Sequence, residues 1–243
     1  MRIALISASV LALGACSANA NGQEAAAAVP GETIQRGYSV DDFNSISLAG
    51  SQNVVVTVGG ARSVRATGDA RTLDQLEITV EDGALRIGQK NSGWDRRMIR
   101  SLPEATIYVS VPSLASAAIG GSGDMRIDRV DGEEFSGSVG GSGDLEIKSL
   151  RAGSASFSLA GSGSIRAAGT VDDTDVSVAG SGDIDLASLK ADNASVSIVG
   201  SGDVRANARR TAAISITGSG DAIISGGARC TVNTMGSGGA RCG

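Results

Sequence analysis

The chain contains no histidine, and this absence excludes several kinds of chemistry before any motif is considered. Ser-His-Asp and Cys-His nucleophile pairs, histidine general bases and zinc sites with imidazole ligands are all ruled out. Aromatic residues make up only 2% of the 243 residues, and there are 3 prolines and 3 cysteines. The net charge of −5 disfavours nonspecific binding to nucleic acid, so we expect no nucleic-acid partner.

Glycine is abundant, with 35 residues, and 41% of the chain is apolar. The glycines show no Gly-x-y period, which excludes collagen, and the apolar content argues against wholesale disorder. The length suits one large domain or two small ones with a real hydrophobic core.

The first fifteen residues have the pattern of a bacterial lipoprotein signal. A basic start is followed by an apolar run over 3–13, which is too short to span a bilayer as a helix. The run Leu13-Gly14-Ala15-Cys16 resembles a lipobox, and the resemblance implies cleavage before Cys16 and lipid attachment to its thiol. Serine rather than aspartate follows Cys16, which favours an outer-membrane lipoprotein facing the periplasm or the cell surface. Ordinary secretion into the periplasm or medium, with cleavage after Ala20, is the alternative.

Residues 16–32 are small and polar without a hydrophobic period, so they are predicted to form a flexible tether. Residues 33–115 have strand patterns without a clear repeat, and residues 116–243 have a strong repeat. We therefore divide the chain into a signal peptide over 1–15, the tether, a β-rich N-terminal part and a repetitive part.

A tetrapeptide that begins with Gly-Ser-Gly and usually ends in Asp occurs seven times in the repetitive part. Successive copies are 20, 20, 19, 20, 18 and 18 residues apart, and a fixed period near twenty predicts a solenoid. The copies begin at Gly121, Gly141, Gly161, Gly180, Gly200, Gly218 and Gly236.

The residues before each tetrapeptide alternate between apolar and small polar, as in Val176-Ser177-Val178. A period of two predicts strands with one buried face and the serines toward solvent. Glycine suits the corner that follows, because such a corner needs a positive φ or a close backbone approach. The predicted fold is all-β: a right-handed parallel β-helix of about seven short coils.

The N-terminal part is predicted to cap this solenoid with irregular β structure. We expect a degenerate coil around Ile46–Ser51 and a short helix near Arg71–Leu76. Gly59-Gly60 and Asp82-Gly83 have the composition of hairpin turns. Further strands are expected at 54–58, 63–67, 76–80, 84–88 and 105–111.

Four stretches together carry a family resemblance: Phe43–Val58, Leu76–Ile87, Ala105–Pro112 and the Gly-Ser-Gly-Asp series. Over about residues 37–224 the chain resembles the putative auto-transporter adhesin, head GIN domain family. The resemblance implies an exported β-helical protein of adhesin-like character, and it brings no catalytic residues and no cofactor.

The aspartates of the repeat would form a column along one edge of the solenoid. Like charges about 5 Å apart repel, so something must offset the repulsion. We expect hydrogen bonds to turn amides, with a bound cation such as calcium as the alternative, and assign no metal site. The column consists of Asp124, Asp144, Asp183, Asp203 and Asp221, interrupted by Ser164.

Two further features are candidate sites. The segment Trp94–Arg100 places one aromatic residue beside Arg96, Arg97 and Arg100, as a loop contacting a glycan, a lipid headgroup or a partner protein would, although an ordinary solvated loop has the same composition. Cys230 and Cys242 are left as an even pair once Cys16 is lipidated, which favours a disulfide in an oxidising compartment.

These features predict a non-enzymatic, lipid-anchored protein of the cell envelope, acting as an adhesin-like or structural binding module. Its partners would be the membrane, through the lipid, and a glycan or an envelope protein. The alternatives are a carbohydrate-active β-helix enzyme of the polysaccharide lyase or hydrolase kind and a scaffold for envelope proteins.

Overall fold

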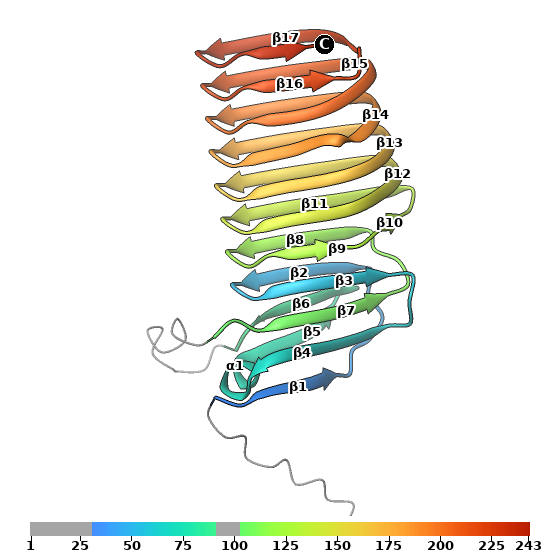
Figure 1. Ribbon diagram of the computed structural model, residues 1–243, viewed down its shortest axis with the longest axis vertical. Coiled ribbons are helices and arrows are strands. Elements are labelled where there is room, and N and C mark those ends of the chain that lie inside the picture. Colours follow the sequence, from blue (N-terminus) through green and yellow to red (C-terminus); the bar gives the residue numbers. More distant parts are fainter. Residues whose placement is uncertain (1–30, 91–102) are drawn as a thin grey trace, which may run out of the picture.

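The computed structural model describes residues 31–90 and 103–243, which form one stack of β coils with a single short helix (Figure 1). The coils from β8 to β17 follow one another in chain order, and β1, β4 and β5 lie at the opposite end of the stack. The elements are β1 (Thr33–Tyr38), β2 (Ser45–Gly50), β3 (Asn53–Val58), β4 (Ser63–Asp69), α1 (Ala70–Gln75), β5 (Leu76–Glu81), β6 (Ala84–Gln89), β7 (Thr106–Val111), β8 (Ser116–Gly121), β9 (Met125–Ile127), β10 (Val130–Asp131), β11 (Glu134–Gly141), β12 (Asp144–Gly161), β13 (Ser164–Gly180), β14 (Asp183–Gly200), β15 (Val204–Gly218), β16 (Ala222–Ser225), β17 (Arg229–Gly236) and β18 (Ala240–Cys242).

Each coil has two walls that meet at a Gly-Ser-Gly corner. We call the strand segments that end at a corner the first wall and those that begin after it the second wall. Neighbouring coils pair in parallel in both walls; Val178 lies opposite Ile198 in the first wall, and Ile165 lies opposite Ile184 in the second. Residues about twenty apart in sequence are therefore neighbours, and six complete turns lead from Gly121 to Gly236, which confirms the predicted stack of short coils.

The corner glycine is required by the close stacking of successive coils. Gly161 has φ +131°, and a Cβ atom there would lie 2.2 Å from the carbonyl oxygen of Gly141 in the coil before it. That same oxygen accepts hydrogen bonds from the amides of Ser162 and Gly163, at 2.9 and 3.1 Å. A side chain at the corner would therefore displace the group that holds two coils together.

The interior is a continuous column of mainly Ile, Val, Leu and Ala side chains, with Phe43, Phe135 and Phe157 among them. The rings of Phe135 and Phe157 have centroids 6.3 Å apart. Gly137 makes room for them, since a Cβ atom there would lie 3.1 Å from the Phe157 ring and 3.3 Å from the Phe135 ring. Both rings are thus accommodated by the missing side chain of Gly137, which lies in the same strand as Phe135 and opposite Phe157.

The N-terminal part contributes a further coil to the same stack. Leu48 pairs with Ile119 and Gly50 pairs with Gly121, so β2 lies directly beside β8, 71 positions away in sequence. In the same way β3 lies beside β9, with Val54 opposite Met125. The prediction of a degenerate coil at this point is confirmed.

The chain between these two coils forms the end of the stack. Strands β6 and β7 extend the two walls by pairing in parallel with β2 and β3. Beyond them the pairing becomes antiparallel, because β5 pairs with β6, β4 with β7 and β1 with β4. Helix α1 follows β4, with the Asp69 side chain accepting a hydrogen bond from the amide of Arg71 at 2.9 Å.

The local predictions for this part are mostly confirmed. The predicted strands and the short helix are present with ends shifted by one or two residues. Asp82 and Gly83 both have positive φ and join β5 to β6 as a two-residue hairpin. The hairpin predicted at Gly59-Gly60 is wrong: β3 and β4 pair with opposite edges of β7, so this turn connects strands that are not neighbours. Strand β1 was not predicted.

Candidate functional site

The corner aspartates form a chain of hydrogen bonds along the stack. Oδ1 of Asp183 accepts a hydrogen bond from the amide of Asp203 at 3.1 Å, and Oδ1 of Asp203 accepts one from the amide of Asp221 at 2.9 Å. The series ends where the amide of Gly239 donates to Asp221 at 2.8 Å. The coils nearer the N-terminus repeat the contact, from the Asp144 amide to Asp124 Oδ1 at 3.1 Å and from the Ser164 hydroxyl to Asp144 Oδ1 at 2.7 Å.

Each of these carboxylates therefore binds the corner of the following coil. Where Ser164 replaces aspartate its hydroxyl donates to Asp144, and the series is interrupted there, because the amide of Asp183 donates to the carbonyl oxygen of Gly163 at 3.2 Å. Charge-assisted hydrogen bonds of this kind offset the repulsion between stacked carboxylates. Among residues 31–90 and 103–243, no group of three or more Cys, Asp or Glu side chains is arranged to hold a metal ion.

The outward side of the first wall is a regular surface of small side chains. Ser158, Ser177, Ser197 and Ser215 lie opposite one another from coil to coil and are exposed. This arrangement follows from the alternation in the sequence, since the apolar residues on either side of each serine are buried.

The outward side of the second wall has larger and charged side chains. One row crosses the whole stack and we call it the arginine row; each member lies opposite the next in the neighbouring strand. In order, the row consists of Arg65, Tyr108, Val55, Arg126, Glu146, Arg166, Asp185, Arg205, Ile223 and Arg241.

Over the regular coils the arginine row alternates in charge. The guanidinium Nε of Arg126 lies 3.4 Å from Oε2 of Glu146, and the alternation continues through Arg166, Asp185 and Arg205. Opposite charges on adjacent strands stabilise such a wall modestly, by about 0.2–1 kcal/mol per pair. This part of the row is therefore accounted for by the stability of the solenoid.

The N-terminal end of the arginine row is different, because its surface is hollowed. A hollow of about 330 Å³ is lined by Gln35, Thr57, Ser63, Arg65, Tyr108, Val109 and Ser110, from β1, β3, β4 and β7. Tyr108 is 46% exposed. A second hollow of about 570 Å³ shares Ser63 and Arg65 with the first and extends toward Tyr38 and Arg62.

The second hollow has its own anchoring contacts. Arg62 forms an ion pair with Asp42, and its guanidinium carbon lies 5.7 Å from the centroid of the Phe43 ring. Burial raises the pKa of the Tyr38 hydroxyl above its usual value. Arg62 is therefore held in place as part of the wall of this hollow.

The two hollows were not predicted from the sequence. The sequence nonetheless indicates that Tyr108 is exposed, because it alternates with the apolar residues Ile107 and Val109, which are buried. The hollow itself depends on β4 and β1 pairing antiparallel beyond β7, and no repeat marks that arrangement.

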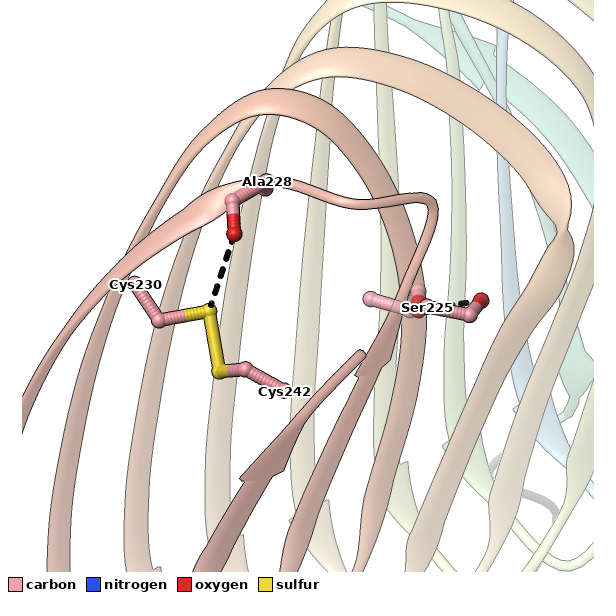
Figure 2. The surroundings of a disulfide bond; sticks show 5 residues. Ser225, Ala228, Cys230 and Cys242 are labelled. Carbon is pink, nitrogen blue, oxygen red and sulfur yellow. Dashed lines mark hydrogen bonds between the residues drawn. A yellow bond between two sulfur atoms is a disulfide. The ribbon is translucent and has the colours of Figure 1, made fainter.

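The two cysteines of the last coil are joined in the structure. Figure 2 shows the disulfide between Cys230 of β17 and Cys242 of β18, with a Cα–Cα distance of 6.5 Å. Since β17 belongs to the first wall and β18 to the second, the bond ties the two walls of the final coil together. The predicted lipidation site Cys16 and the loop residues Trp94, Arg96, Arg97 and Arg100 lie outside the described residues.

Within residues 31–90 and 103–243, no helix has the length and apolar character needed to cross a bilayer.

No curated protein matches the sequence. Solved structures share its fold, and three bacterial proteins illustrate the likeness. A putative adhesin from Bacteroides fragilis NCTC 9343 has a TM-score of 0.78 at 22% identity, covering 87% of this chain and 97% of that one.

The second is a putative lipid binding protein from Parabacteroides distasonis ATCC 8503, with a TM-score of 0.68 and 24% identity over 88% of this chain and 97% of that one. The third is a putative adhesin from Parabacteroides merdae ATCC 43184, with a TM-score of 0.65 and 17% identity over 88% and 97%. At these identities the likeness establishes a common fold.

The sequence also matches the family described as "Putative auto-transporter adhesin, head GIN domain" over residues 42–228. The chain, whose stacked corners and degenerate coil form a β-solenoid, belongs to this head GIN domain family.

Proposed function

We propose that the protein is a non-enzymatic, lipid-anchored binding module of the cell envelope, adhesin-like in character. The observation that carries this proposal is the shortness of the corners. In residues 144–200 only two residues separate one long strand from the next, such as Ser162 and Gly163 between β12 and β13. The walls are therefore continuous sheets that expose regular rows of side chains, a form suited to contact with an extended partner.

The same corners argue against a polysaccharide-degrading enzyme. A catalytic cleft on a β-helix needs loops long enough to rise above the wall and bring acidic groups together around a substrate. In this solenoid the corner carboxylates bind amides of the following coil instead. The family and the structural neighbours are likewise described as adhesins or binding proteins.

The place of β1 supports the anchoring part of the proposal. Strand β1 begins at Thr33 and lies at the end of the stack opposite the C-terminus (Figure 1). The second wall contains eleven successive strands, and the ten spacings between them, at about 4.8 Å each, give a stack of about 48 Å. If residues 16–32 form the flexible tether that the sequence predicts, its root-mean-square reach would be about 20–25 Å. Lipid on Cys16 would then hold the stack by its N-terminal end, with the walls free to bind.

The test is made in the bacterium with the full chain and a Cys16→Ser variant. We expect labelled palmitate to enter the wild type and not the variant, and the variant to leave the membrane fraction. Cells displaying the protein should adhere to envelope glycans or proteins without shortening any polysaccharide offered. Labelling that persists in the variant contradicts the anchor, and depolymerisation by purified protein contradicts the non-enzymatic role.

A further inference from the structure

We propose that the hollow around Tyr108 and Arg65 binds a saccharide that bears a carboxylate, such as a uronic acid unit. In this site the sugar ring lies against the Tyr108 ring and its carboxylate pairs with Arg65. The inference rests on the proposed function and deepens it, because it names the ligand class and the part of the surface that takes it.

Tyr108 presents its ring at the surface of the protein. Phe43, Phe135 and Phe157 are buried in the core, whereas Tyr108 is 46% exposed. Tyr38 is partly buried against the core, so Tyr108 is the one exposed aromatic in residues 31–90 and 103–243. A rigid aromatic face at the surface, with a hydroxyl at its edge, is suited to packing against the apolar face of a sugar ring.

Polar side chains surround the Tyr108 ring. Gln35, Thr57, Ser63 and Ser110 line the same hollow and supply an amide and three hydroxyls. Within the described part of the chain, their side chains have no hydrogen-bond partner of their own. Donors and acceptors that converge on a hollow without internal partners are available to the hydroxyls of a ligand.

Arg65 differs from most arginines of the arginine row in the residues that lie opposite it. In the arginine row most arginines lie opposite an acidic residue, as Arg126 does with Glu146. Arg65 instead lies between Tyr108 and Gly37, and no carboxylate lines either hollow. A guanidinium presents a planar fork that binds a carboxylate through two hydrogen bonds, so an acidic group on the ligand would complete the site.

The dimensions agree with a short saccharide. The hollow of about 330 Å³ at Tyr108 is at the lower end of the range of small-ligand sites, about 300–1,000 Å³. Its neighbour of about 570 Å³ shares Arg65 and Ser63, so a second sugar unit can follow toward Tyr38 and Arg62. Because the hollows are open, a single site binds weakly, and many copies on one cell would supply the avidity.

The experiment measures binding of oligogalacturonate to the full mature protein by calorimetry or ligand-observed NMR. Neutral galacto-oligosaccharide and free acetate are measured in parallel, to separate the sugar from the anion. The variants are Tyr108→Ala, Tyr108→Phe and Arg65→Gln. The matched control is Arg205→Gln, which removes an arginine from the same row on β15. Unchanged thermal midpoints establish that every variant is folded.

We expect oligogalacturonate to bind the wild type more tightly than either the neutral sugar or acetate. Tyr108→Ala and Arg65→Gln should each weaken this binding at least about tenfold, as loss of one stacking or charge-assisted contact does. Tyr108→Phe and Arg205→Gln should change it less than about twofold. Equal binding of acetate, or equal binding by Tyr108→Ala and Arg65→Gln, overturns the inference.

The outcome can be distinguished from failure of the proposed function. If displaying cells adhere normally when both Tyr108 and Arg65 are replaced, the protein is a binding module that uses another surface, and this inference is wrong. If cells displaying the wild type do not adhere to any envelope material, the proposed function itself is wrong.

Discussion

A single methyl group at one corner should weaken the solenoid, whereas the same methyl group one residue earlier should not. Gly141 has φ +139°, and a Cβ atom there would lie 2.3 Å from the carbonyl oxygen of Gly121. Gly140 has ordinary space, because the nearest atom to its Cβ position is the oxygen of Ile119 at 3.7 Å. The two glycines are adjacent in β11, and we expect an alanine to destabilise the fold at Gly141 but not at Gly140.

The magnitude follows from two contributions. A non-glycine residue held in a sparsely populated positive-φ region costs about 1–3 kcal/mol. The oxygen of Gly121 also accepts hydrogen bonds from Ser142 and Gly143, at 2.9 and 3.1 Å, and displacing it weakens two bonds of about 0.5–1.5 kcal/mol each. Gly141→Ala should therefore lower the free energy of unfolding by about 2–5 kcal/mol, and Gly140→Ala should change it by less than about 1 kcal/mol.

The assay is urea unfolding of the wild type and both variants, followed by circular dichroism and analysed by linear extrapolation. We expect the midpoint to fall clearly for Gly141→Ala and to stay close to the wild type for Gly140→Ala. Equal effects of the two substitutions would refute the argument that successive corners lie in contact.

Three further predictions concern the carboxylates and the disulfide. Asp203→Ala should lower the free energy of unfolding by about 0.5–1.5 kcal/mol in urea titration, because the next corner amide loses its acceptor, whereas Asp203→Asn keeps an oxygen there and should cost less. Removing the disulfide with Cys230→Ser and Cys242→Ser should lower the thermal midpoint, since closing a loop of this length stabilises a fold by about 3 kcal/mol; a midpoint insensitive to both the variant and a reductant would contradict this. The side chain of Arg71 lowers the pKa of Asp69 by hydrogen bonding. The ionised Asp69 therefore stabilises the fold at pH values above its unfolded pKa of about 3.9. This stabilisation is lost as the pH falls through the lower pKa of Asp69 in the folded protein. Thermal midpoints of the wild type should thus approach those of Asp69→Asn in acid and exceed them at pH 7, and a constant difference across the pH range would contradict this assignment.

The regular part of the fold is predictable because its cause is local and repeated. A corner that tolerates only glycine recurs every coil, and apolar residues such as Val178 and Ile198 take the same place before each corner. Period and alternation together therefore determine which residues are stacked. The capping contacts of the aspartates follow from the same motif, since the residue after the second glycine is held beside the next corner.

The end of the stack is less predictable because its contacts have no period. Pairing between β2 and β8 links residues 71 positions apart, and the intervening chain turns antiparallel where it closes the stack. Gly59-Gly60 has the composition of a hairpin, yet β7 inserts between the strands that it connects. The hollow beside Tyr108 is a product of that insertion, so its lining residues come from four strands whose pairing the sequence does not reveal.

The stacking of successive coils can be tested directly by cysteine cross-linking on the first wall. Ser177 lies opposite Ser197, whereas Ser158 lies opposite Ser177 and is two coils, about 9.6 Å, from Ser197. Disulfides need Cα atoms within about 7 Å, so mild oxidation should link the Ser177→Cys/Ser197→Cys pair and leave the Ser158→Cys/Ser197→Cys pair unlinked. Peptide mass spectrometry that finds the second bond and not the first would contradict the stacked-coil account.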